Sequence, residues 1–116
     1  MASPAPVASG ARAAAGAFQL TAGADGHLAA QGPLTFATAR RARELGRPLI
    51  AGSSAAALEV DLSGVSASDS AGLAVLIDWL AQARHAQRTL RYRGVPAGLS
   101  ALARISEVEE LLARGV

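Results

Sequence analysis

The side chains of this sequence that could carry out chemistry are few, and their spacing forms no catalytic set. Cysteine and lysine are both absent, which excludes thiolate nucleophiles, cysteine metal sites and the lysine of a phosphate-binding loop. The two histidines, His27 and His85, are far apart in the sequence and lie in no Ser-His-Asp or Cys-His pattern. We interpret both as solvated surface residues, and predict that the chain is not an enzyme and holds no cofactor.

Two carboxylates, Asp61 and Asp69, flank the segment between a predicted strand and a predicted helix. A pair of acids near the end of a strand can chelate Mg²⁺. A helix cap explains Asp69 without a metal, because an aspartate before a helix accepts hydrogen bonds from the free N–H groups of the first turn. Asp61 falls on the polar face of its strand. Metal binding is therefore the minor interpretation, and we predict no metal site.

Composition limits the chain to one domain. Its 116 residues suffice for a single core, and the scarcity of aromatic residues means that Leu, Val, Ile and Ala must build it. The net charge of +2 is too small and scattered to predict nucleic-acid binding. Residues 1–17 are small, aperiodic and proline-containing, which predicts a flexible tail before a domain over residues 18–116. No segment is long and apolar enough to span a bilayer, so we expect a cytoplasmic protein.

The first half of the domain predicts a hairpin and a helix. Residues 18–30 alternate on both sides of an Asp-Gly pair, which is typical of a β-hairpin. Thr35 is the predicted cap of a helix over residues 36–45, which Gly46 and Pro48 would end. The segment that follows is compatible with a further helical turn and a loop.

The second half predicts a βαβ unit. Residues 58–62 and 89–95 alternate as strands, and residues 70–87 between them have helical periodicity. Two strands joined by a helix are expected to be parallel, with a right-handed crossover. Each strand keeps one charged face, and the acids of the first could meet the arginines of the second. The helices should therefore cover mainly one face of the sheet.

The C-terminal segment predicts two further helices. Pro96 suits the first turn of one helix, and Ser106 with Glu109 forms the pattern of a capping box that starts a shorter one. The residues of the first helix expected to face inward are Leu99, Leu102, Ala103 and Ile105.

The helix over residues 70–87 has an apolar stripe and a second apolar strip beside it. At 100° per residue, Val75, Trp79 and Gln82 fall together, away from the centre of the stripe. Two interpretations are open for Trp79: it covers the edge of the core, or it lies partly exposed and anchors a partner, as aromatic residues at interfaces often do. The stripe itself consists of Leu73, Leu76, Ile77 and Leu80.

The order of these motifs resembles the STAS domain family. "LEVDLSGV", "DSAGL", an apolar helix and "LRYRGVP" are similar to the central strand, signature loop, helix and next strand of that family. The resemblance covers residues 18–114 and implies a single α/β domain: a mixed β-sheet with a βαβ core and helices mainly on one face. The ending "VPAGLSALARISEVEELL" is most similar to the MlaB branch.

The resemblance also implies a function and a site. MlaB-like proteins are non-catalytic cytosolic subunits that bind and regulate the MlaF-like ATPase of a phospholipid-transport ABC transporter, which maintains outer-membrane lipid asymmetry from the inner membrane. Ser70 corresponds to the position phosphorylated in anti-sigma-factor antagonists, although the second serine usual there is Ala71. The alternative is thus an antagonist switched by an anti-sigma kinase. The partner-binding residues implied are Asp69, Ser70, Gly72, Val75, Trp79 and Gln82.

Overall fold

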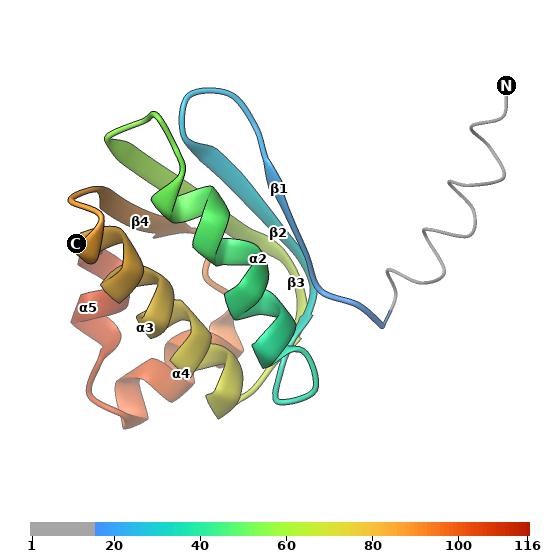
Figure 1. Cartoon of the computed structure of the whole chain (residues 1–116). Coiled ribbons are helices and arrows are strands. Elements are labelled where there is room, and N and C mark those ends of the chain that lie inside the picture. The colour runs from blue at the N-terminus through green and yellow to red at the C-terminus, as the bar shows by residue number, and fades with distance from the viewer. Residues whose placement is uncertain (1–15) are drawn as a thin grey trace, which may run out of the picture.

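The computed structural model describes residues 16–116, so the predicted flexible tail lies almost wholly outside the described residues. Four strands form one mixed sheet in the order β1-β2-β3-β4 (Figure 1). Their alternating apolar residues are buried on one side of the sheet. β1 is antiparallel to β2, whereas β2, β3 and β4 run parallel. The strands are β1 (Gln19–Ala22), β2 (His27–Leu34), β3 (Ala57–Ser68) and β4 (Thr89–Arg93).

The helices of the described residues pack mainly on one face of this sheet, as predicted. Two consecutive βαβ units progress in the same direction across the sheet, and crossovers of one hand then place both connecting helices on the same side. Figure 1 shows these two helices, α2 and α3, side by side in front of the strands, with α4 packed beyond α3 and α5 next to β4. The helices are α2 (Ala39–Ala51), α3 (Ser70–His85), α4 (Ala97–Ile105) and α5 (Glu109–Arg114).

The hairpin and the βαβ core are confirmed. The Asp25-Gly26 pair forms the turn between β1 and β2, and both residues have the positive φ angles that such turns require. β3 pairs with β4 in parallel register, with Leu58 opposite Leu90. The inward residues of the four strands meet the apolar stripe of α3, and all of these residues belong to one hydrophobic core.

The predicted start and end of the first helix are wrong. α2 begins at Ala39 rather than at Phe36, because the Thr38 hydroxyl group closes the preceding turn: it donates to the Pro33 carbonyl and accepts from the Thr35 N–H group. Gly46 and Pro48 lie inside α2, which continues to Ala51, and a loop follows, so the segment after Pro48 is indeed a helical turn and a loop.

Two predictions about the C-terminal segment are also wrong. Ile105 does not face inward; it is 79% exposed at the end of α4, whereas Leu99 and Ala103 are buried and Leu102 is half-buried. Ser106 ends α4 rather than capping the next helix, and α5 starts after Val108 with no side-chain cap.

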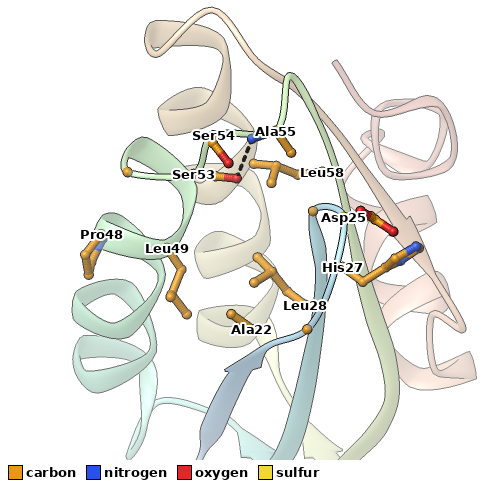
Figure 2. Close-up of a pocket in the computed structure, with 13 residues that line it drawn as sticks. Ala22, Asp25, His27, Leu28, Pro48, Leu49, Ser53, Ser54, Ala55 and Leu58 are labelled. Atoms are coloured by element: carbon orange, nitrogen blue, oxygen red, sulfur yellow. Dashed lines mark hydrogen bonds between the residues drawn. The ribbon is translucent and has the colours of Figure 1, made fainter.

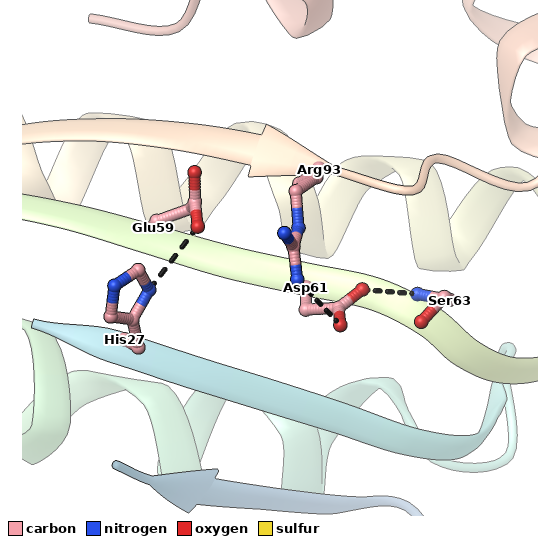
Figure 3. Close-up of polar contacts among 5 residues, drawn as sticks. All are labelled: His27, Glu59, Asp61, Ser63 and Arg93. Carbon is pink, nitrogen blue, oxygen red and sulfur yellow. Dashed lines mark hydrogen bonds and ion pairs between the residues drawn. The ribbon is translucent and has the colours of Figure 1, made fainter. Parts of the chain in front are cut away.

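The uncovered face of the sheet carries a ladder of polar side chains. Figure 3 shows Asp61 between Arg93, at 3.3 Å, and the N–H group of Ser63, at 2.9 Å. These contacts hold the pKa of Asp61 below its ordinary value, chiefly through the bonds from Ser63. Glu59 lies opposite Arg91 in the register but pairs instead with His27 of β2, at 3.1 Å. The predicted meeting of acids and arginines therefore holds for one pair, and such exposed pairs contribute little stability.

Candidate functional site

Asp69 joins two loops at the edge of the sheet where β2 and β3 end. Its carboxylate accepts a hydrogen bond from the Gly72 N–H group in the first turn of α3, at 3.0 Å, which confirms the predicted cap. The other carboxylate oxygen accepts from the N–H group of Phe36, in the loop between β2 and α2, also at 3.0 Å. These bonds, the one from Phe36 first, lower the pKa of Asp69. One side chain therefore fixes both loops.

Phe36 is the residue of this edge that the sequence pattern missed. As the predicted first residue of a helix, Phe36 had no special role. In the structure it lies in the loop that Asp69 holds, and its side chain is 84% exposed. Single exposed apolar side chains are common on protein surfaces. What distinguishes Phe36 is that Asp69, the residue that caps α3, holds its loop at the start of that helix. The sequence would have given a signal if the helix start had been placed at Ala39, because Phe36 would then have been a phenylalanine in a loop outside the helix.

Ser70 is exposed next to this loop, at the first position of α3. Ala74, four residues further along the same helix face, is exposed as well. We call Phe36, Ser70 and Ala74 the Ser70 surface. It combines an exposed hydroxyl group at a helix N-terminus with an exposed phenylalanine on the loop that Asp69 holds, so it can meet a partner by both polar and apolar contact.

Gly72 has a structural role, because its lack of a side chain allows another backbone segment to approach α3 closely. The backbone is that of this chain: a Cβ atom at Gly72 would lie 2.0 Å from the carbonyl oxygen of Leu34, in β2. Gly72 is buried, so it does not itself offer a surface to a partner. Its contribution to the site is to let α3 sit directly against the end of β2.

The prediction that Val75 and Trp79 form a partly exposed strip is wrong. Both side chains are fully buried. The reason is α2, which packs on α3 at this position: Gly46 has no side chain, and the indole ring of Trp79 fills the space above it, with Phe18 on another side at a ring separation of 6.0 Å. The interpretation of Trp79 as core is therefore the correct one, and the folded domain presents neither residue to a partner.

Gln82 is half-buried and belongs to a different region of the surface. Its amide group donates to the Asp78 carboxylate at 2.6 Å, and it lines a groove between the C-terminal ends of α2 and α3. Gln82 lies near the C-terminal end of α3, whereas the Ser70 surface is at the N-terminal end of that helix. Of the six residues implied as partner-binding, the structure thus brings Asp69 and Ser70 together at one exposed edge.

A cleft of about 470 Å³ lies at the opposite end of the sheet, between the β1–β2 turn and the loop that leads into β3. Figure 2 shows Leu28 and Leu49 directed into it, while Asp25 and His27 point away. The hydroxyl group of Ser53 accepts a bond from a backbone N–H group of its own loop. No reactive side chains converge in this cleft.

The two acids considered as Mg²⁺ ligands, Asp61 and Asp69, lie far apart in the fold. Among residues 16–116, no group of three or more His, Asp and Glu side chains lies close enough to hold an ion. Asp61 and Asp69 stand eight residues apart along extended β3, a separation of roughly 25 Å at about 3.3 Å per residue. None of the described helices is long and apolar enough to cross a membrane.

Comparison with known proteins agrees with this architecture. A family model described as MlaB, STAS domain matches residues 18–113. The solved structure of the anti-sigma factor antagonist SpoIIAA in its unphosphorylated form is similar, with 12% identity, a TM-score of 0.58, and coverage of 81% of this chain and 82% of that one. No curated protein sequence matches the chain significantly.

Two solved structures of anion transporters contain the same fold as one part. The chain matches the overall structure of SLC26A9 with 18% identity and a TM-score of 0.59, over 72% of this chain and 16% of that one. For murine Slc26a9 in the inward-facing state, the identity is 21%, the TM-score 0.53, and the coverage 78% and 14%. These likenesses show the fold alone. The family match over nearly the whole described domain shows that the chain belongs to the STAS domain family, in its MlaB-type group.

Proposed function

We propose that this chain is a non-catalytic, cytoplasmic STAS subunit that binds an MlaF-like ATPase and regulates or stabilises it within a phospholipid-transport ABC transporter. In this function it lies peripheral to the inner membrane, and the transporter maintains outer-membrane lipid asymmetry. The MlaB-type family match supports the assignment, and the observation that carries it is the Ser70 surface, fixed by the Asp69 hydrogen bonds to Phe36 and Gly72. The partner hydrolyses ATP.

The energetic centre of the contact is Phe36. Aromatic side chains that become buried at the centre of an interface contribute most of its binding free energy, and this ring is almost fully exposed in the free domain. Ser70 contributes about one hydrogen bond at its rim, roughly 0.5–1.5 kcal/mol. A charge placed at Ser70 would be buried without a counter-ion in the complex, which is strongly unfavourable.

The test is the affinity of the purified chain for the MlaF-like ATPase of the same organism. Phe36→Ala should weaken binding by about 2 kcal/mol or more, and Ser70→Asp should weaken it strongly while the domain stays folded. Ile105→Ala is the matched control, because Ile105 is the other large apolar side chain that is mostly exposed in the described residues. Equal affinity of wild type, Phe36→Ala and Ser70→Asp would reject the proposed interface.

A second candidate function is favoured by the exposure of Ser70 at a helix N-terminus. There a phosphate group would be stabilised by the helix dipole and accessible to a kinase. In that function the chain is an anti-sigma-factor antagonist, and its partner is an anti-sigma kinase. Incubation with the candidate kinase and ATP, followed by mass measurement of wild type and Ser70→Ala, separates the two functions. Phosphate on Ser70 together with no binding to the ATPase would select the antagonist.

A further inference from the structure

The exposed surface of α2 carries an excess of positive charge, with four arginines and one acid. Arg40, Arg41, Arg43 and Arg47 are all exposed, and none takes part in an ion pair within residues 16–116. Glu44 is the only acid of α2. The acids that do form ion pairs are engaged elsewhere: Glu59 with His27, Asp61 with Arg93, Glu109 with Arg104, and Glu110 with Arg114.

The stability of α2 does not account for these arginines. Arg40 and Arg41 lie in its first turn, where the helix dipole makes positive charge unfavourable, and this turn has no acid to compensate. Three of the four, Arg40, Arg43 and Arg47, recur at i, i+3 and i+7 and therefore share one side of the helix. Arg47 borders α3, so this side faces the seam between the two helices.

The seam opens into a groove of about 500 Å³ at the end of this row of arginines. Its apolar lining consists of Ala51 of α2, Ala81 of α3 and Ala86, the residue just after α3, and its polar lining consists of Arg47, Gln82 and His85. α2 and α3 run parallel, since each follows a parallel strand, so both helices contribute their C-terminal ends here. The groove can take an aliphatic side chain while the arginine row, which extends from it towards the start of α2, faces acidic groups.

We propose that the arginine row of α2 and this groove form a second docking surface, which binds an acidic amphipathic helix of a partner protein. Aliphatic residues of that helix occupy the groove, and its carboxylates pair with Arg40, Arg43 and Arg47. The occupant follows from charge complementarity. Residues 1–15 of this chain contain no acid and one arginine, so they do not fit. A second copy fits poorly, because the ion pairs within each copy already engage four of its nine acids.

A flat anionic membrane is the competing occupant of any basic surface. The groove favours a helix as the occupant. Its small alanine side chains cannot insert into a membrane, whereas the groove can accommodate a protruding leucine of a partner helix. The groove lies at the opposite end of α3 from Ser70, whereas the arginine row starts at Arg40, in the first turn of α2 and four residues after Phe36. The groove is therefore the part of the second surface that is separate from the Ser70 surface.

The test uses the full chain and a synthetic helical peptide with leucines at i, i+3, i+4 and i+7 and glutamates on its other faces. Amide chemical shifts should move for Arg47, Ala51 and the stretch 81–86 on titration. A triple change of Arg40, Arg43 and Arg47 to Gln should lower the affinity by about tenfold, the combined effect of three exposed ion pairs. Ala81→Trp, which fills the groove and keeps every charge, should also abolish the specific shifts.

Two control variants test whether peptide binding is specific to this surface. One tests for general electrostatic attraction, and the other tests for an effect of the Ser70 surface. The triple change of Arg91, Arg93 and Arg104 to Gln removes the same charge elsewhere, and Ser70→Asp alters the other surface; both should bind the peptide as wild type does. If the two triple arginine variants weakened peptide binding equally, the effect would come from net charge alone, and the proposal would be overturned. No peptide binding, or binding only to vesicles that contain anionic phospholipid, would overturn it as well.

Discussion

Substitution of Gly46 by alanine tests the packing of α2 on α3. In an exposed helix this change stabilises a protein by about 1 kcal/mol. Here the new Cβ atom would lie 2.2 Å from Nε1 and 2.7 Å from Cε2 of Trp79, and the indole ring is fully buried, so it has no free space to enter. Overpacking of a core costs about 1–3 kcal/mol, and an overlap this large belongs at the upper end. We expect a net loss of about 2 kcal/mol.

The assay is urea unfolding followed by tryptophan fluorescence, because Trp79 is the only tryptophan. Gly98→Ala in α4 is the control: its Cβ atom would meet nothing closer than the Ser68 hydroxyl group at 3.6 Å, so this variant should be as stable as wild type or slightly more stable. The native emission should be blue-shifted and resistant to acrylamide. If Gly46→Ala were instead as stable as Gly98→Ala, the helices would not pack at Trp79, and its assignment to the core would be refuted.

Two more predictions concern the edge of the sheet where the Ser70 surface lies. Gly72→Ala should destabilise the domain by about 3 kcal/mol or more, because its Cβ atom meets the backbone oxygen of Leu34, which is held in a strand and cannot rotate away; a midpoint of urea unfolding equal to wild type would contradict this. Asp69→Asn should keep the cap but lose the bond from Phe36, since an amide NH₂ group would face an N–H donor, at a cost of about 1–2 kcal/mol at neutral pH. Because the native pKa of Asp69 is lowered, its carboxylate stabilises the fold above the ordinary aspartate pKa, and this contribution disappears as the pH falls through the native value. The stability gap between the two proteins should therefore narrow from pH 7 to pH 3, and a gap independent of pH would contradict the role given to the charge.

Local patterns were sufficient to predict the strands and the crossover order. The alternation in residues 58–62 and 89–95, the Asp-Gly turn and the helical stripe of residues 70–87 each depend on neighbours within a few positions, and the structure has all of them. The cap at Asp69 is local as well, since its partner Gly72 is three residues away.

The errors arise where a distant segment decides the outcome. The loop at Phe36 is held by the local bonds of Thr38 and also by Asp69, 33 residues further along the chain, so the pattern around Thr35 gave only part of the information that places the helix start. The helical wheel of α3 considers one helix in isolation and cannot show that α2 covers its second side. One local signal did point to the burial of Trp79: residues 71–77 are almost entirely apolar on every side, which is typical of a helix buried all round.

The position of the proposed surfaces follows from the topology of the sheet. Parallel β2 and β3 end at the same edge of the sheet, so the loop that carries Phe36 and the start of α3 lie beside each other there. The side chain of Asp69 is long enough to join the two segments by hydrogen bonds. The same topology makes α2 and α3 parallel, so the groove forms at their common end, a helix length away. A partner side chain in the groove and a partner contact at Ser70 therefore lie at opposite ends of α3, and a variant that fills the groove, such as Ala81→Trp, should leave binding at Ser70 intact.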